Sequence, residues 1–187
     1  MQIEVLPLAP EQMKQKVADE SQLGFGKIFT DRMLLVEWSS DKGWHNARIK
    51  PYEPFMLDPS TTVLHYAQEI FEGLKAYKWE DGRIALFRPE MNARRFNQSA
   101  NRLCMPEVPE ELFLSGIDQL VALEKDWIPT APETALYIRP AMIAVDPYLG
   151  VKPGDHYYFF VILSPVGAYY AAGFNPVSIL VEDKLDR

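Results

Sequence analysis

The chain has 187 residues, 48% of them hydrophobic and 24% charged, which is typical of a globular protein and excludes disordered and fibrous classes. The net charge of -7, with its acidic residues scattered, argues against a nucleic-acid partner, because proteins that bind phosphate backbones need a basic face. We expect no membrane span, secretory signal, disulfide or metal site, and a cytoplasmic location, because the sequence has no long apolar run, no signal-like N-terminus, one cysteine and three histidines.

The N-terminal part of the chain predicts a helix followed by a pair of strands. Pro10 and the polar residues up to position 20 predict a short helix with proline in its first turn. The apolar and aromatic run from Met33 to Trp38 predicts a strand. Residues 39–43 form the expected turn, and residues 44–52 form the return strand, which Pro51 ends.

A second hairpin follows. Tyr66 and Ile70 fit one helical turn within residues 66–73, with Gly73 as its stop. Residues 74–88 then contain two alternating runs joined at Asp81 and Gly82. Because this pair suits the positive φ angles of a tight turn, the segment gives the clearest hairpin prediction in the chain.

Two helices are predicted in the middle of the chain. Pro89 opens the first, which extends from about Glu90 to Cys104, and Cys104 is expected to be a buried core thiol. The second extends from about Glu110 to Asp126, with leucine, isoleucine and valine forming one apolar face.

Two strongly apolar segments, residues 133–145 and 156–166, predict central strands that are buried on both faces. Residues 1–166 are therefore expected to form one α+β domain, with a mostly antiparallel sheet and packed helices. The small and Pro/Gly-rich residues 167–176 are typical of an interdomain linker, and residues 177–187 predict the first strand of a further domain.

Several tyrosines and arginines lie within or beside segments that are expected to be buried. A buried arginine is costly unless a carboxylate or phosphate meets it. Arg139 and Tyr137 alternate on one strand, so their side chains share a face. Either Tyr137 is a core residue and Arg139 pairs with a local acid, or the phenol and the guanidinium point together at an acidic ligand. The same expectation of burial covers Tyr66, Phe71 and Tyr169.

Three arginines lie on the helix that Pro89 opens: Arg94, Arg95 and Arg102. A lone arginine there is compatible with a solvated helical face. The alternative is that one of them reaches a phosphate group.

Seven motifs, in order and spacing, resemble the N-terminal half of branched-chain amino acid aminotransferases, pyridoxal phosphate enzymes with the fold of D-amino acid aminotransferase. The resemblance covers residues 23–187, and the longer motifs distinguish this family from its relatives. The motifs are LGFGKIFTDRMLLVEW, LHYAQEIFEGLKAY, LFRPEMNARRFNQSANRL, KDWIP, LYIRPAMIA, LGV and VILSPVGAYY.

The resemblance implies roles at the cofactor and the apolar pocket. Arg95 matches the arginine that contacts the phosphate of pyridoxal 5′-phosphate, and bidentate guanidinium geometry suits that contact. Phe25, Tyr66, Phe71 and Tyr137 match aromatic walls of the pocket that receives the branched side chain.

Further matches concern the second substrate and a partner subunit. Leu149 and Val151, together with Tyr169, match positions that the neighbouring subunit of a homodimer contributes. Arg139, with Tyr66 and Tyr169, resembles the set that accepts the distal carboxylate of glutamate. The implied reaction moves the amino group of leucine, isoleucine or valine to 2-oxoglutarate in two half-reactions.

The lysine that forms the Schiff base in this family is expected beyond Arg187, because Lys75, Lys78 and Lys184 lack its flanking residues. The 187 residues alone are therefore expected to be inactive. Two alternatives stay open: a related D-amino acid aminotransferase or aminodeoxychorismate lyase, and a non-catalytic small domain that serves as an interaction or dimerisation module.

Overall fold

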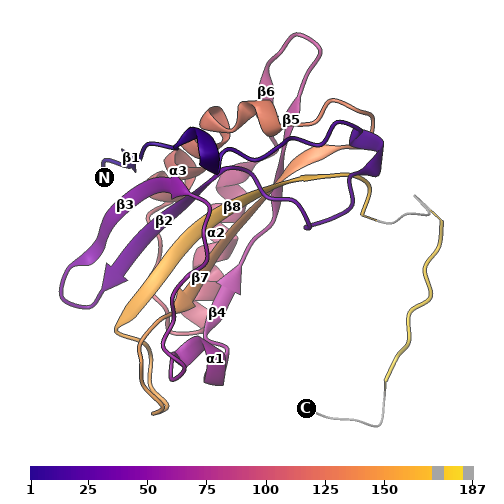
Figure 1. Ribbon diagram of the computed structural model, residues 1–187. Helices are drawn as coiled ribbons and strands as arrows, with labels where there is room; N and C mark the ends of the chain where they lie inside the picture. Colours follow the sequence, from indigo (N-terminus) through magenta and orange to yellow (C-terminus); the bar gives the residue numbers. More distant parts are fainter. Residues whose placement is uncertain (170–174, 183–187) are drawn as a thin grey trace.

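The computed structural model describes residues 1–169 and 175–182. Residues 4–166 contain a curved sheet with two long helices on one face (Figure 1). The strands are β1 (Glu4–Val5), β2 (Arg32–Ser39), β3 (Gly43–Pro51), β4 (Glu69–Phe71), β5 (Leu74–Lys78), β6 (Ile84–Leu86), β7 (Ala135–Ala144) and β8 (His156–Val166). The helices are α1 (Thr62–Tyr66), α2 (Pro89–Arg102) and α3 (Glu110–Leu123), and the 3-10 turns are η1 (Pro10–Gln12), η2 (Glu20–Gln22) and η3 (Lys125–Trp127).

The sheet has the order β1-β3-β2-β8-β7-β5-β6, and β4 also pairs with β7. Among the described residues, only β1 and β3 pair in parallel. β7 and β8 lie at the centre and pair along their length, from Ala135 opposite Val166 to Ala144 opposite Tyr157. The predicted α+β class, the mostly antiparallel sheet and the central position of these two apolar strands are confirmed. Within the described ranges, no helix is long and apolar enough to span a membrane.

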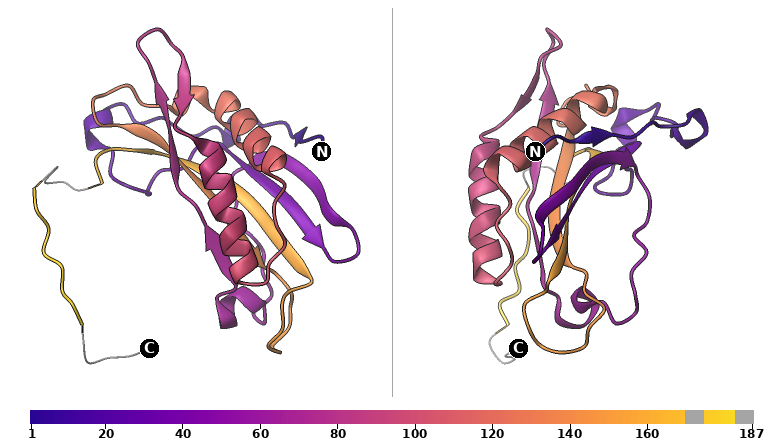
Figure 2. Two further views of the ribbon diagram at one scale, coloured as in Figure 1. Left: turned by 180° about the vertical axis from the view of Figure 1, so that it is seen from behind. Right: turned by 90° about the vertical axis from the view of Figure 1, so that its left-hand side faces the viewer.

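The main core lies between the sheet and the two long helices (Figure 2). The ring centroids of Phe96 on α2 and Phe113 on α3 are 5.5 Å apart, and both rings contact Phe159 on β8, at 5.6 and 5.8 Å. Ile138 of β7 is fully buried in the same cluster. Burial of each such side chain contributes about 1.5–3 kcal/mol. Because strand side chains alternate, the neighbours of Ile138 lie on the other side of the sheet, which we call the outer face.

Two predicted elements were wrong. Residues 10–12 form the single turn η1, residues 13–19 are irregular and residue 20 begins η2, because the segment carries no apolar face and none of the η1 residues is buried. In residues 66–73, Tyr66 ends α1 and residues 69–71 form β4. Here Ile70 is buried between exposed neighbours and pairs opposite Met142, so the strand period applies where a helical turn was expected.

The two long helices lie within three residues of their predicted ends, but the prediction for Cys104 was wrong. Cys104 is exposed and has a φ of 55°, immediately beyond α2. The backbone reverses at this residue, so that Met105 enters the core and the thiol does not. Residues 175–182 are exposed and have no strand assignment, while residues 170–174 and 183–187 lie outside the described residues. The predicted linker and final strand therefore stay predictions.

Candidate functional site

Tyr137 and Arg139 lie together on the outer face of β7. Nη2 of Arg139 donates a hydrogen bond of 2.8 Å to the hydroxyl of Tyr137. The guanidinium lies 4.4 Å from the centroid of the Phe71 ring and 5.3 Å from that of Tyr137. These contacts suit a cation, because the faces of aromatic rings carry partial negative charge.

No carboxylate lies within ion-pair distance of Arg139 in the part of the chain that the structure describes. Its Nε is buried and has no hydrogen-bond partner there. The interpretation that Arg139 pairs with a local acid was therefore wrong. A half-buried guanidinium that forms no ion pair with the described carboxylates can accept a carboxylate from a ligand.

Gly73 leaves the space that the Tyr137 phenol occupies. A Cβ atom at position 73 would lie 2.2 Å from the hydroxyl oxygen of Tyr137 and 2.9 Å from its Cζ. The backbone of Gly73 thus passes directly beside the phenol, and no other amino acid leaves room for this contact without a shift. The glycine fixes where the hydroxyl can meet Arg139.

Two further aromatic rings, those of Phe25 and Tyr169, extend this group of contacts. The ring of Phe25 meets the ring of Tyr137 edge to face, with centroids 5.0 Å apart. It meets the ring of Tyr169 in the same way, with centroids 4.9 Å apart. Phe25 and Tyr169 also line a hollow of about 640 Å³, together with residues around Leu23 and Thr134. Four of the predicted aromatic residues, with Arg139, therefore form one continuous cluster.

The expectation that this whole set is buried was wrong. Tyr66, Phe71 and Tyr169 are 42%, 61% and 64% exposed. The two long helices α2 and α3 cover the opposite face of the sheet, so side chains on the outer face and its loops stay accessible. Tyr137, Arg139 and Phe25 are half-buried. Partial exposure is what an open ligand-binding surface requires.

Tyr66, Leu149 and Val151 lie apart from this cluster. The hydroxyl of Tyr66, at the end of α1, donates a hydrogen bond to the backbone oxygen of Leu149. Leu149 and Val151 lie on the loop between β7 and β8, and their side chains are exposed. The Tyr66 side chain hydrogen-bonds to Leu149 and its ring lies beside that of His65, whereas Tyr137 contacts Arg139 and Phe25.

Arg95 is connected to the cluster through Glu72, which directly follows Phe71. The Nε and Nη2 atoms of Arg95 donate hydrogen bonds of 2.5 and 2.8 Å to the two carboxylate oxygens of Glu72. Asn92 donates a third, of 2.9 Å. Burial alone raises the pKa of Glu72, but hydrogen bonds from Arg95 and Asn92 outweigh burial, so the pKa lies below its ordinary value. The carboxylate stays charged and orients the guanidinium.

The outer side of Arg95 faces solvent. It borders a hollow of about 400 Å³ that is also lined by Ser99, Arg102 and Gln98. Two guanidinium groups, a hydroxyl and an amide are donors that suit a phosphate. Arg94, by contrast, lies 3.6 Å from Glu110 and forms a surface ion pair.

Glu72 and Gly73 were missed by sequence reasoning. Both lie in the motif that contains Phe71, but a buried acid and a glycine without positive φ carry no distinctive local pattern. The only available indication was their place directly after Phe71, which was already singled out.

Comparison with known proteins shows which proteins the sequence is similar to. A Bacillus subtilis protein, branched-chain-amino-acid aminotransferase 2, is 52% identical over 174 residues, which is 93% of this chain and 48% of that protein. A branched-chain-amino-acid aminotransferase of Mycolicibacterium smegmatis is 54% identical over 165 residues, covering 88% of this chain and 45% of the relative. The chain is homologous to the N-terminal part of branched-chain aminotransferases.

Solved structures of branched-chain aminotransferases agree with this homology. The Escherichia coli enzyme matches with a TM-score of 0.56 at 21% identity, covering 73% of this chain and 41% of that chain, and so supports the fold. The Thermobaculum terrenum enzyme in its PLP form matches with a TM-score of 0.52 at 25% identity, covering 70% of this chain and 39% of that chain. No protein-family model matches. The chain spans about half the length of the curated branched-chain aminotransferases that it matches.

Proposed function

We propose that these residues form the substrate-pocket part of a pyridoxal phosphate-dependent branched-chain aminotransferase. The reaction converts L-leucine, L-isoleucine or L-valine to the 2-oxo acid and passes the amino group to 2-oxoglutarate, which leaves as L-glutamate. Homology at about half sequence identity supports the reaction class. The cluster around Tyr137 supports the pairing of substrates.

The observation that carries this proposal is that Arg139 contacts aromatic rings and forms no ion pair with a described carboxylate. One site must hold an aliphatic side chain and then the carboxylate of glutamate. The rings of Phe25, Phe71 and Tyr137 offer an apolar wall, while Arg139, held by a 2.8 Å hydrogen bond to Tyr137, offers a cation at its edge. A pocket that is apolar with a few placed polar groups can accept both ligands.

The residues near α2 fit the cofactor phosphate. Arg95 and Arg102 border one hollow with Ser99, and Glu72 orients Arg95 without covering its outer side. We assign phosphate binding to Arg95. The bound pyridoxal supplies the electron sink for negative charge at the substrate α-carbon. What this chain adds is binding, orientation and partial exclusion of water.

A homodimer is part of the proposal. Leu149 and Val151 expose aliphatic side chains on a loop that the Tyr66 hydroxyl holds at its backbone. We propose that these two residues and Tyr169 line the pocket of the partner subunit. Exposed aliphatic groups on a fixed loop suit such an interface.

The test expresses the gene with every codon of its reading frame and supplies pyridoxal phosphate. Leucine, isoleucine and valine should each change the absorbance of the bound cofactor, and 2-oxoglutarate should reverse the change. No change with any of the three amino acids would refute the proposal. A faster reaction with D-alanine than with L-leucine would assign the chain to a different aminotransferase activity.

A further inference from the structure

Residues 20–31, which we call the Phe25 loop, are joined at both ends to the chain that leaves α3. The loop has no regular structure after η2, yet it carries the Phe25 ring against Tyr137. An irregular segment of this length loses much conformational entropy when it is ordered, so specific contacts must hold it in place.

The first tie is at Glu20. One carboxylate oxygen, Oε2, accepts hydrogen bonds from the backbone N–H groups of Thr130, at 2.8 Å, and Ala131, at 2.7 Å. Both donors lie just beyond η3. This single oxygen therefore joins the beginning of the Phe25 loop to the segment that follows α3.

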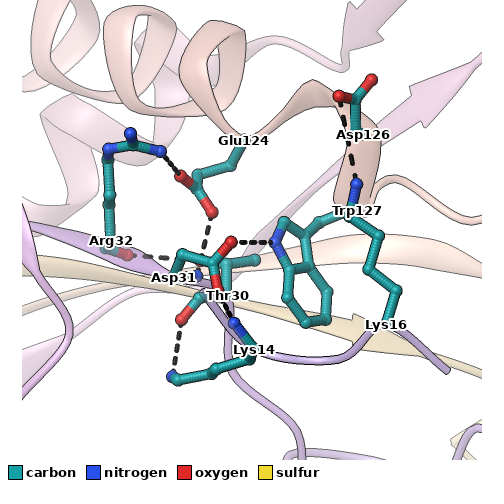
Figure 3. A network of polar contacts seen from close by, with 8 residues as sticks. All are labelled: Lys14, Lys16, Thr30, Asp31, Arg32, Glu124, Asp126 and Trp127. Carbon is teal, nitrogen blue, oxygen red and sulfur yellow. Dashed lines mark hydrogen bonds and ion pairs between the residues drawn. The ribbon is translucent and has the colours of Figure 1, made fainter. Parts of the chain in front are cut away.

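The second tie is at Asp31, which is 6% exposed (Figure 3). Its Oδ2 accepts the indole N–H of Trp127 at 3.0 Å, and its Oδ1 accepts the backbone N–H of Lys14 at 2.8 Å. The backbone N–H of Asp31 donates in turn to Glu124, which is 1% exposed, at 3.0 Å. Glu124 is charge-balanced by Arg32 at 2.7 Å. Every carboxylate oxygen in this buried group thus meets a donor.

Between the two ties the loop is held against β8 and its continuation. The N–H of Gly167 donates to the oxygen of Gly24 at 3.2 Å, and the N–H of Thr30 donates to the oxygen of Leu163 at 3.1 Å. A Cβ atom at Gly167 would lie 2.4 Å from the oxygen of Leu23. Phe25 therefore lies in a stretch that is fixed on both sides.

We infer that Glu20 and Asp31 are positioning residues that hold Phe25 over Tyr137 and so set the width of the side-chain pocket. This inference rests on the proposed function for the identity of that pocket. Both carboxylates accept hydrogen bonds from backbone N–H groups, and Asp31 also accepts one from the Trp127 indole, so we assign their effect to the position of the loop. A wall that is ordered before the substrate enters favours a branched side chain that fills the gap over a smaller one that does not.

The first experiment measures hydrogen exchange of the amides of Gly167 and Thr30, whose hydrogen bonds to Gly24 and Leu163 join the Phe25 loop to β8 and its continuation. Glu20→Ala removes the acceptor and should speed exchange roughly tenfold. Glu20→Gln keeps one oxygen that can accept both N–H groups, so it should restore the slow rate. Glu11→Ala, at an exposed glutamate outside the loop, is the matched control and should change nothing. Unchanged exchange in Glu20→Ala would overturn the inference.

Asp31 allows a more specific version of this test. Its two oxygens each face an N–H donor, so Asp31→Asn must turn its own NH₂ group toward a donor and should speed exchange. Trp127→Phe removes the indole donor, so the NH₂ group introduced by Asp31→Asn can point to this side without facing another N–H group. Asp31→Asn should therefore have little effect, within about twofold, in the Trp127→Phe background. Equal effects in both backgrounds would contradict the assigned hydrogen bonds.

The second experiment compares leucine with alanine in the protein expressed from its whole reading frame. Glu20→Ala should lower kcat/KM for leucine relative to alanine by roughly tenfold, chiefly through KM, and Glu20→Gln should restore the ratio. An unchanged ratio despite faster exchange would overturn the link between the loop and specificity. Absence of leucine turnover in the unaltered protein would refute the proposed function, while the exchange experiment would still decide whether the ties hold the loop.

Discussion

Gly73→Ala gives a sharp test of how the Tyr137 phenol is placed. The added methyl carbon would lie 2.2 Å from the hydroxyl oxygen and 2.9 Å from Cζ. Relief to ordinary contact requires a shift of about 1 Å, which breaks the 2.8 Å hydrogen bond with Arg139. Overpacking costs about 1–3 kcal/mol and the lost hydrogen bond about 1 kcal/mol. The lower conformational entropy of the unfolded chain with alanine stabilises the fold by about 0.4–1 kcal/mol. The net expected loss of stability is about 2 kcal/mol.

The assay is urea unfolding of four proteins: the unaltered chain, Gly73→Ala, Tyr137→Phe and the double variant. Tyr137→Phe removes the oxygen that the new methyl group meets first, so Gly73→Ala should cost about 1 kcal/mol less in that background. The remaining cost reflects the ring carbons, of which Cζ is the nearest. Equal costs in both backgrounds, or a cost below about 0.5 kcal/mol, would refute the proposed role of Gly73.

Two further predictions concern Glu72 and the isolated chain. Because the pKa of Glu72 lies below its ordinary value, its ion pair with Arg95 stabilises the fold at neutral pH, and this stabilisation is lost as the pH falls through the folded-state pKa. The stability difference between the unaltered chain and Glu72→Gln should therefore be largest near neutral pH and shrink in acid; urea unfolding across that range measures it, and a difference that grows in acid would contradict the assignment. The 187 residues expressed alone with pyridoxal phosphate should produce no glutamate from leucine and 2-oxoglutarate in an end-point assay, and measurable turnover would show that a lysine within them serves the chemistry.

The fold was largely predictable where one periodicity dominated. The continuous apolar runs that became β7 and β8 predicted central strands, and Asp81 with Gly82 predicted the hairpin of β5 and β6. The segment around Ile70 failed because one turn of helix and three residues of strand give the same short pattern. Tertiary pairing with β7 decided between them.

The sequence predicted which residues belong to the candidate site better than it predicted how their side chains are placed and buried. Alternation on β7 correctly placed Tyr137 and Arg139 on one face. It gave no information about which face the helices would cover, so the burial of Phe71 and Tyr169 was misjudged. Glu72 was missed because its importance comes from Arg95, which is distant in sequence and reaches it only in the folded chain. Whether Tyr66, Leu149 and Val151 complete the pocket stays a prediction.

We propose that Arg139 receives the distal carboxylate of glutamate on a surface that otherwise accepts aliphatic side chains. Single-turnover half-reactions of the Arg139→Gln variant, expressed from the whole reading frame, test it most directly. Loss of a charge-assisted contact of about 3 kcal/mol should slow the glutamate half-reaction roughly a hundredfold and leave leucine within about threefold. Arg83→Gln, at an exposed arginine of the β5–β6 hairpin, should change neither rate. Equal losses for leucine and glutamate in Arg139→Gln would contradict the account.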